Sequence, residues 1–427
     1  MDYLLNEYRY FNRLQKSNFV LNIKQKKQAM SKVLFLSIPS HGHMNPILGL
    51  AAELVRQGEE VTFFSAEEFR TAIEEIGAEF KCYQEDLNVF QKKSSGGLVS
   101  AFLQPKKFIF DLLEQIGGYK FDYIVYSAAY PYANAIAQIL KIPAVSSFAV
   151  FATLKELLPK HNLAEAPLKK DKGPMGITPE VMKEFKGVRQ SLIDKYQVEI
   201  AEDMFKLLFN KGDLNIIYTS KYFIPNLENY DDSYIFIGPP IYNKKYAVDF
   251  PFEKLEGKKV IYISMGTMFS NYSTELNHLF LKTFADFDGV VVMAAYQVDL
   301  SGYEIPENFI IREYVPQLEI LKYTSVAITH SGMNSIGDLL YNKIPFVAIP
   351  LGADQFYLAN RAQELGATIV LDIHNLSTGL LKDAVQQVQT NPDYLKNINK
   401  ISDSFIQAGG YEKAADEIFK LKKEKGI

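Results

Sequence analysis

The chain has a single cysteine, Cys82, among its 427 residues. One cysteine excludes an internal disulfide and any metal cluster that several thiolates would hold. This scarcity fits a reducing compartment, so we expect a cytoplasmic protein. We expect Cys82 itself to be a small buried residue rather than a nucleophile.

The sequence also lacks a long apolar run and an excess of charge of one sign. No stretch reaches the roughly 18 uncharged apolar residues that a membrane span needs. The formal charge of −4 at pH 7 gives no reason to expect nucleic acid or an anionic membrane as a partner. Hydrophobic residues make up 48% and charged residues 22%, as in ordinary globular proteins, and the length corresponds to two domains.

The first 30 residues differ in composition from the rest of the chain. They are rich in Lys and Arg, but they contain neither an apolar core segment nor a small-residue cleavage site, so they are not a secretory signal. We expect an extension outside the fold. A basic amphipathic anchor is the alternative.

From Lys32 onward, short apolar runs alternate with longer stretches of helical spacing, the pattern of βαβ units. Helices are predicted at 46–57, 132–140 and 411–423. Strands are predicted at 33–38, 61–64, 123–126, 144–147, 215–218 and 234–237, and again at 260–264, 289–293, 309–312, 326–329, 346–349 and 368–371. The fold class is therefore α/β, with two consecutive αβα halves and a cleft between them. Parallel sheets bind ligands beyond the carboxyl ends of their strands, so the loops there are the place to look for a site.

Composition shifts divide the chain further. Residues 1–30 lie outside the fold, 31–238 form a first domain and 239–252 a linker that follows Gly238. Residues 253–408 form a second domain, and 409–427 a final helix that we expect to pack back on the first domain.

The strongest motif runs from Val326 to Ser335. A buried strand ends, a small-residue turn follows and a helix begins, with Gly332 allowing a close backbone approach. The N-terminus of such a helix holds an anion through its unpaired amides and its dipole, and His330 and Ser335 add side-chain donors. Two further strand ends offer small or polar groups: Gly266 with Thr267, and Asp354 with Gln355, whose carboxylate and amide suit vicinal sugar hydroxyls.

Taken in order, Tyr314-Val-Pro-Gln317, His330-Ser-Gly-Met-Asn-Ser335, Asp338 and the run from Pro350 to Asp354-Gln355 resemble the donor signature of the UDP-glycosyltransferases, glycosyltransferase family 1. The resemblance extends from about Lys32 to the final helix and is closest to the bacterial macrolide- and flavonoid-modifying branch. It implies the GT-B fold, two Rossmann-like domains across a cleft, with the acceptor bound by the first domain and the donor by the second. It also implies an inverting mechanism, a UDP-sugar donor, and neither a metal nor another cofactor.

The same resemblance implies a role for each donor residue. Tyr314 stacks on the uracil where relatives usually have Trp, Gln317 lies by the uridine, and Asp338 stands in for a Glu that binds the ribose. Val315 belongs to the same donor site. Thr267, His330, Asn334 and Ser335 hold the diphosphate, and Asp354 and Gln355 bind the sugar hydroxyls. Gly266 and Gly332 are donor-site positions where the backbone can approach the ligand closely.

The first strand runs into a segment with two histidines, His41 and His43, followed by Pro46. This is not G-x-G-x-x-G, so a dinucleotide fingerprint is absent from the place where it belongs. We expect the histidines in a turn facing the cleft and a helix that Pro46 opens. An imidazole suits the removal of a proton from an acceptor hydroxyl, although a histidine at a strand end often only makes local hydrogen bonds. The resemblance selects His43 as the base and leaves His41 as a neighbour.

Relatives have an Asp that orients and charges this histidine, and the matching position, at the end of strand 123–126, is Ser127. Serine can accept a hydrogen bond from the ring but cannot stabilise an imidazolium as a carboxylate does. Three explanations stay open: weaker catalysis, an acceptor acidic enough to need little help, or a chain that binds without turnover. Asp122 lies too far back along the strand to substitute.

The acceptor pocket and a metal site are less defined by the sequence. Tyr130, Phe148 and Phe151 follow strand ends where an aromatic acceptor could stack, or they belong to the core. Asp286 and Asp288 have the spacing that metal-dependent transferases use, but they precede a strand at its amino end, so we expect a surface loop and no metal.

Three classes of function compete. The leading one is an inverting transferase that moves a hexose from a UDP-sugar, UDP-glucose first, to a hydroxyl of a small, largely apolar molecule such as a macrolide or flavonoid. The others are a sugar-nucleotide epimerase or hydrolase, and a non-catalytic nucleotide-sugar binder. We expect a monomer or weak homodimer whose partners are the donor and a small acceptor.

Overall fold

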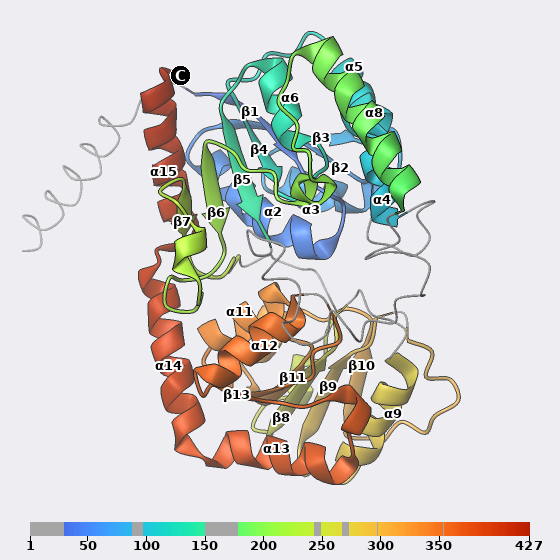
Figure 1. Ribbon diagram of the computed structural model, residues 1–427. Coiled ribbons are helices and arrows are strands. Elements are labelled where there is room, and N and C mark those ends of the chain that lie inside the picture. The colour runs from blue at the N-terminus through green and yellow to red at the C-terminus, as the bar shows by residue number, and fades with distance from the viewer. Residues whose placement is uncertain are drawn as a thin grey trace, which may run out of the picture.

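In the computed structural model, residues 30–87, 97–149, 178–242, 249–266, 273–296, 298–352 and 354–427 are described. Figure 1 shows two α/β units, one above the other. The first half of the chain forms the upper unit and most of the second half forms the lower one.

The upper sheet has seven parallel strands in the order β3-β2-β1-β4-β5-β6-β7. Successive side chains of a strand point to opposite faces, so Val33 and Phe35 pack on one side and Leu34 and Leu36 on the other. Helices cover both faces, and the central strands are therefore apolar throughout. The strands are β1 (Lys32–Leu36), β2 (Glu60–Ser65), β3 (Glu79–Cys82), β4 (Tyr123–Ser127), β5 (Ala144–Phe148), β6 (Leu214–Ile217) and β7 (Tyr234–Phe236).

The lower sheet has six parallel strands in the order β10-β9-β8-β11-β12-β13. Its two central strands end in register, with Ser264 beside Thr329. The strands are β8 (Val260–Ser264), β9 (Val290–Ala294), β10 (Phe309–Arg312), β11 (Thr324–Thr329), β12 (Phe346–Ala348) and β13 (Thr368–Val370). Every strand expected from the sequence is present, with its ends within two residues of the expected ones.

The helices alternate with the strands. In the upper unit they are α2 (His41–Arg56), α3 (Arg70–Glu75), α4 (Gly97–Leu103), the π-helical turn η2 (Lys106–Phe110), α5 (Asp111–Ile116), α6 (Ala133–Leu140) and α8 (Pro179–Tyr196). The remaining helices are α9 (Ser273–Phe284), α10 (Gln317–Leu321), α11 (Met333–Tyr341), α12 (Gln355–Glu364), α13 (Thr378–Thr390), α14 (Pro392–Gln407) and α15 (Gly410–Lys425). Single 3₁₀ turns lie at η1 (Glu67–Phe69), η4 (Met204–Leu208), η5 (Leu227–Asn229), η6 (Phe252–Lys254) and η8 (Ile373–Asn375).

Two local expectations were wrong. The edge strand β3 was not expected, because its four residues include Glu79 and Lys81 and form no apolar run. Cys82 is exposed rather than buried, since it is the last residue of this edge strand.

The helix α2 begins at His41, not at Pro46, so both histidines lie in its first turn instead of in a preceding loop. A proline within a helix has no N–H to donate to the carbonyl four residues earlier, here that of Gly42. That carbonyl instead accepts a hydrogen bond from Asn334 Nδ2, at 3.2 Å. The sequence pattern missed the early start because the compensating donor comes from a residue far along the chain.

The last two helices connect the units. Figure 1 shows α14 and α15 rising along one side, from the lower unit to the upper one. Phe405 of α14 packs against Phe223, with ring centroids 5.8 Å apart, and α15 packs on α2. The two sheets define the cores of two domains but not where each domain ends. We therefore propose the domain boundaries expected from the sequence: 31–238 for the first domain, 239–252 for the linker, 253–408 for the second domain and 409–427 for the final helix.

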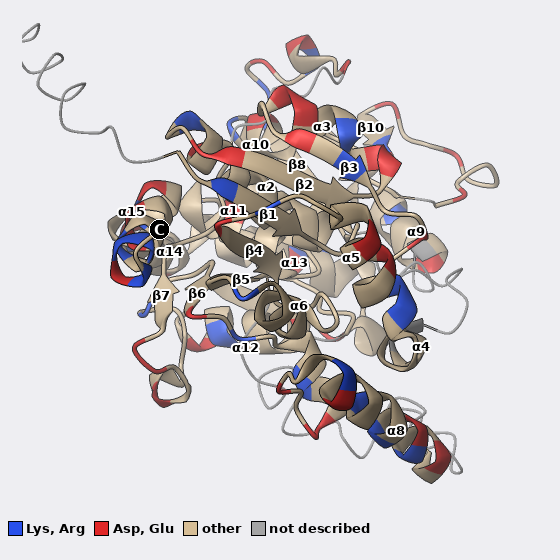
Figure 2. Ribbon diagram, turned by 90° about the horizontal axis from the view of Figure 1, so that it is seen from above, with Lys and Arg blue, Asp and Glu red and all other residues tan. Residues whose placement is uncertain are grey.

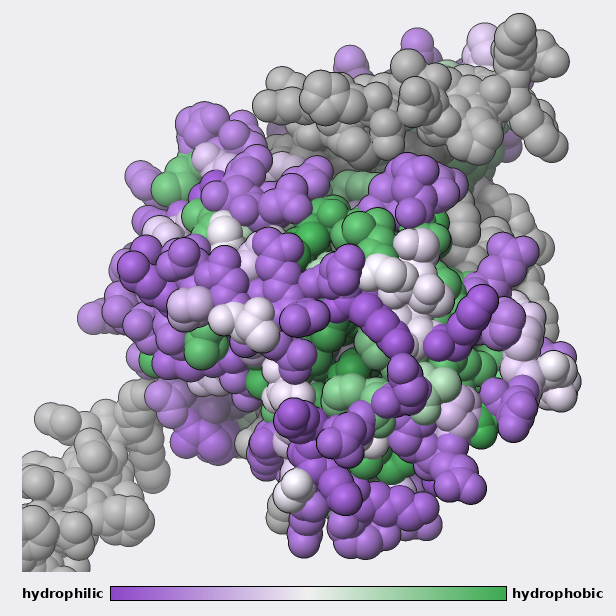
Figure 3. Space-filling model, turned by 90° about the horizontal axis from the view of Figure 1, so that it is seen from below, coloured by the Kyte–Doolittle hydropathy of each residue, from purple (hydrophilic) through white to green (hydrophobic). Residues whose placement is uncertain are grey.

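The described surface is mostly polar. Acidic and basic residues intermingle along α8 and α15 in Figure 2, and in the view of Figure 3 hydrophobic residues are interspersed among hydrophilic ones. None of the helices in the described part of the chain is long and apolar enough to span a membrane.

A buried ion pair holds α15 to the upper sheet. Lys422 Nζ lies 2.7 Å from Glu59 Oε1, both side chains are only 2% exposed, and the Tyr123 hydroxyl donates to Glu59 Oε2 at 2.9 Å. Removing one partner leaves an uncompensated buried charge, which costs far more than loss of an exposed pair.

We therefore expect Lys422→Ala to lower the free energy of unfolding by about 3 to 5 kcal/mol, measured by urea denaturation. Lys420→Ala is the matched control, because Lys420 pairs with Glu417 on the exposed side of the same helix. It should cost about 0 to 1 kcal/mol. Equal losses in the two variants would show that the buried pair does not hold the helix.

Candidate active site

The site lies where the carboxyl ends of the two sheets approach each other. Two contacts bridge the units there: Asn334 Nδ2 to the Gly42 carbonyl at 3.2 Å, and the Tyr314 hydroxyl with His41 Nε2 at 3.3 Å. Both involve the first two residues of α2. Loops that follow β1, β10 and β11 are thus brought together.

His43 is the third residue of the same helix and lies in its first turn. Its Nδ1 lies 3.0 Å from Ser127 Oγ at the end of β4. Burial lowers the pKa of His43 to about 4, so the imidazole is uncharged at neutral pH. In the tautomer that carries its hydrogen on Nδ1 and donates it to Ser127, the lone pair of Nε2 is the basic position of the ring.

Asp122 does not substitute for the carboxylate that relatives have at position 127. Its Oδ2 accepts from the backbone N–H of Lys32 at 2.7 Å. This bond lies at the amino ends of β1 and β4, the opposite edge of the sheet from His43.

On the lower unit, α11 points its N-terminus at this region. The first amides of a helix have no acceptor within the helix, and no side chain caps α11 at Gly332. Ser331 has a φ of 64°, a conformation that costs energy for a residue other than glycine and is often found at functional sites. Ser331 Oγ and Asn334 Oδ1 are buried without a hydrogen-bond partner among the described residues. Strained backbone and unsatisfied polar atoms together mark a binding site more than a structural turn.

The His330 ring fills the space between two glycines. A Cβ at Gly266 would lie 2.5 Å from His330 Nε2 and one at Gly332 would lie 2.6 Å from it, so a side chain at either position would displace the ring. The Nδ1 of the ring lies 3.3 Å from the Ser264 carbonyl. Burial lowers the pKa of His330 to about 4, an effect that this contact with the carbonyl partly offsets. A carbonyl oxygen can only accept, so in this contact Nδ1 carries the hydrogen of the uncharged ring and donates it to Ser264, which leaves the lone pair of Nε2 next to both glycines.

Gln317 and Asp338 lie side by side. Gln317 Nε2 donates to Asp338 Oδ2, and Gln317 Oε1 accepts from the Tyr262 hydroxyl at 2.9 Å. Burial raises the pKa of Asp338 to about 7, against the opposing effect of the bond from Gln317. The carboxyl therefore changes charge near neutral pH.

Tyr314 is an exposed aromatic residue at the entrance to this region, with 45% of its surface accessible. Its ring lies between those of Tyr296, at 5.1 Å, and His41, at 5.3 Å. Val315 is half-buried and packs against the core of the lower unit. A ring held from two sides but open to solvent is suited to stacking on a planar ligand.

Asp354 and Gln355 begin α12 after β12. Gln355 Oε1 accepts from the backbone N–H groups of Leu351 and Gly352, at 2.8 and 3.2 Å. Its oxygen is therefore used within the loop, and its amide nitrogen is the group that can donate to a hydroxyl. Burial raises the pKa of Asp354 to about 6.

Two expected acceptor residues are core residues instead. Tyr130 is wholly buried, its hydroxyl donates to the Phe108 carbonyl at 3.1 Å, and its ring packs edge-on against Phe108. Phe148 is also wholly buried, 5.7 Å from the ring of Tyr234. Neither side chain can touch a ligand from these positions. The expectations for Phe151 and Thr267 fall outside the described residues.

The described residues hold no group of three or more His, Cys, Asp or Glu side chains placed to bind a metal. Asp286 lies in the exposed loop before β9 and pairs with Lys382 at 2.9 Å.

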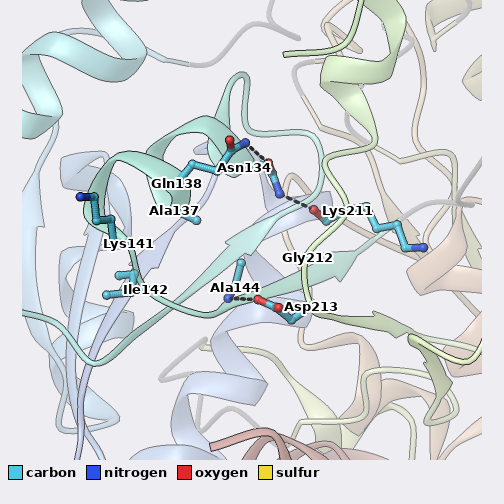
Figure 4. A pocket seen from close by; sticks show the side chains of 9 residues that line it. All are labelled: Asn134, Ala137, Gln138, Lys141, Ile142, Ala144, Lys211, Gly212 and Asp213. Atoms are coloured by element: carbon cyan, nitrogen blue, oxygen red, sulfur yellow. Dashed lines mark hydrogen bonds between the residues drawn. The ribbon is translucent and has the colours of Figure 1, made fainter. Parts of the chain in front are cut away.

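A hollow of about 410 Å³ lies at the amino-end edge of the upper sheet, opposite the edge where His43 lies (Figure 4). Its walls come from α6 and from the amino ends of β5 and β6, where Ala144 donates its N–H to Asp213 Oδ2. It contains none of the residues expected to bind donor or acceptor.

Sequence reasoning missed three participants: His41 as a partner of Tyr314, Tyr262 as a donor to Gln317, and the Gly42 carbonyl. One signal was available, because Pro46 stands four residues after Gly42 and so frees that carbonyl. The other two pair residues that are far apart in the chain, and no local pattern indicates them.

Known proteins resemble this chain over nearly its whole length. A family model described as "UDP-glucoronosyl and UDP-glucosyl transferase" matches residues 252–406, which include every expected donor residue. The uncharacterized UDP-glucosyltransferase YojK of Bacillus subtilis is 35% identical over 407 residues, covering 93% of this chain and 98% of that protein. The NDP-glycosyltransferase YjiC of Bacillus licheniformis is 32% identical over 399 residues, covering 90% and 96%.

Solved structures show the same fold at lower identity. The glycotransferase of kitacinnamycin has a TM-score of 0.75 at 23% identity and covers 92% of this chain and 99% of its own. CalG4, the calicheamicin glycosyltransferase, has a TM-score of 0.73 at 23% identity, covering 93% and 99%. The expected GT-B fold is confirmed. With relatives this similar over nearly its whole length, the chain belongs to the UDP-glucuronosyl and UDP-glucosyl transferase family and is a glycosyltransferase that uses a nucleotide sugar.

Proposed function

We propose that the protein transfers a hexose from UDP-glucose to a hydroxyl of a small, largely apolar acceptor, with inversion at the anomeric carbon. The observation that carries this proposal is the position of His43. An uncharged, half-buried imidazole lies in the first turn of α2, and the preceding residue, Gly42, contacts Asn334 at the N-terminus of α11. A base and an anion site therefore face each other across one cleft.

In the proposed reaction, His43 Nε2 takes the proton of the acceptor hydroxyl as its oxygen attacks C1 of the sugar. The bond from C1 to the diphosphate oxygen breaks, and UDP leaves with the added negative charge. The amides at the N-terminus of α11 and the Ser335 hydroxyl stabilise that charge, and His330 contributes as a donor in the tautomer that carries its hydrogen on Nε2. Because helix amides and a side-chain donor lie ready there, we propose that departure of UDP needs no metal.

The remaining donor residues take the uridine and the sugar. Tyr314 stacks on the uracil beside Val315, and Gln317 and Asp338, already paired, receive the ribose hydroxyls. Gly266, Gly332, Asn334 and Ser335 surround the diphosphate, with Thr267 as a further member of this set. Asp354 and the amide nitrogen of Gln355 bind the sugar.

Ser127 shapes the choice of acceptor in this proposal. It holds the ring of His43 but adds no negative charge, so the imidazolium formed in the reaction is less stable than beside a carboxylate. A weak base acts best on an acidic hydroxyl, which favours phenols over aliphatic alcohols. The structural neighbours named for kitacinnamycin and calicheamicin favour a natural product as the acceptor class. Ser127 is also the observation that supports the second candidate, a nucleotide-sugar binder without turnover.

We expect purified protein with UDP-glucose, EDTA and pooled phenols and macrolides to give a hexose adduct by mass spectrometry. His43→Ala should lower kcat by about 10²- to 10⁴-fold and leave the affinity for UDP nearly intact. His278→Ala is the control, because His278 is exposed on α9 and stacks on Tyr303. UDP binding without product from any pool, with several donor sugars tried, would favour the non-catalytic alternative.

A second prediction concerns Asp338, whose pKa is about 7. The ionised carboxylate accepts hydroxyl donors and the protonated form does so poorly, so UDP should bind more tightly as the pH rises from 6 to 8. Asp338→Asn should show a flatter dependence by calorimetry. The folded pKa lies above the ordinary value of 3.8. The free energy of unfolding of the UDP-free protein, relative to that of this variant, should therefore decrease as the pH rises from 4 to 7. Identical pH dependence in the two proteins would remove Asp338 from the ribose site.

A third prediction tests the link between Ser127 and His43. Ser127→Asp should raise the pKa of His43 by about 1 to 3 pH units, because a carboxylate then faces Nδ1. Ser127→Asn is a neutral control of similar size and should leave the pKa near 4. NMR titration of the His43 ring measures this directly, without an acceptor. Equal pKa values in the two variants would mean that the position does not control the charge of the ring.

A further inference from the structure

The two hydrogen bonds that join the upper and lower units involve adjacent residues of one helix. Gly42 accepts from Asn334 at 3.2 Å, and His41 lies 3.3 Å from the hydroxyl of Tyr314. His43 is the next residue, and Ser127 holds its ring from the other side at 3.0 Å. Within the upper unit the Phe69 ring also packs edge-on against His41, with centroids 5.2 Å apart, so the first turn of α2 is held from both units.

Pro46 makes the first of these contacts possible. In an uninterrupted helix the carbonyl of residue 42 would accept the N–H of residue 46, but proline has none. A helical carbonyl without its donor seeks another one, and Asn334 Nδ2 supplies it. The proline that disturbs the helix therefore creates the acceptor used across the cleft.

Asn334 occupies the second position of α11, where the proposed diphosphate site lies. Its Oδ1 is buried without a partner among the described residues. An amide oxygen repels a phosphate, and the Asn334 amide nitrogen is already bonded to Gly42. Binding of the diphosphate alone therefore does not account for this side chain. The Nδ2 bond to Gly42 gives the side chain a different task.

We propose that Asn334 and Tyr314 are positioning residues that clasp the first turn of α2, so that donor bound in the lower unit sets the place of His43 in the upper one. This inference rests on the proposed function, because Tyr314 and the N-terminus of α11 are the groups assigned to the donor. A donor that orders these groups also orders Gly42 and His41. The base is then in place only when the donor is.

If Asn334 clasps α2, substitution of Pro46 should affect the rate of transfer, which a role in diphosphate binding alone does not predict. Pro46→Ala restores the N–H that competes with Asn334 for the Gly42 carbonyl. We expect kcat to fall by about 5- to 10-fold, as for loss of one hydrogen bond, with little change in the affinity for UDP. Asn334→Ala should lower kcat at least as much. The double variant should be no slower than Asn334→Ala, because both changes break the same bond.

Tyr314→Phe tests the second contact. It keeps the stacking ring and removes only the hydroxyl that reaches His41, so kcat should fall while KM for the donor holds. The matched control is Asn397→Ala. Asn397 Nδ2 donates to the Gly366 carbonyl at the same distance of 3.2 Å, but within the lower unit, so its loss should leave kcat and UDP affinity unchanged.

Hydrogen exchange gives a readout that needs no acceptor. UDP should slow amide exchange at residues 41–45 in the wild-type protein and in Asn397→Ala, but much less in Asn334→Ala. Such protection without any sugar transfer would support the clasp and defeat the proposed activity. Transfer with unchanged exchange, and with additive effects of Pro46→Ala and Asn334→Ala, would defeat the clasp and leave the activity standing.

Discussion

Parallel strand pairing is the constraint on which the whole arrangement depends. Because every strand of each sheet runs in the same direction, all carboxyl ends of a sheet meet at one edge. The chain places two such edges opposite each other, and the contact between Asn334 and Gly42 spans them. Residues from widely separated segments are thereby brought within hydrogen-bonding distance, here at the starts of α2 and α11.

Most of the fold could be predicted because it follows from local patterns. The strand β8 is a buried run with the expected ends, and the turn from His330 to Ser335 has a recognisable order of small and polar residues. Predictions failed where a tertiary contact decided the outcome. The helix α2 starts before Pro46, and Asn334 replaces the helical donor that this proline lacks. Tyr130 is buried in the core, where its hydroxyl donates to the Phe108 carbonyl.

The replacement of a carboxylate by Ser127 illustrates a different limit. The sequence identifies the position and its chemistry, but not the burial that decides the consequence. In the structure, His43 is enclosed deeply enough to lower its pKa to about 4, and Ser127 is the partner at its Nδ1. Without a charge to oppose desolvation, the ring is a weak base. Restoring the carboxylate would therefore change the charge of His43 before it changed any geometry.

Burial shifts the site's ionisable groups in a common direction. The pKa values of His43 and His330 fall, and those of Asp338 and Asp354 rise, so each group is moved toward its uncharged form. The field at the N-terminus of α11 then comes from fixed amides and dipoles, which need no reorganisation when charge develops on a leaving diphosphate. Such a site depends on the placement of its parts more than on their charge. That dependence is why a carbonyl freed by Pro46 can matter to chemistry that it never touches.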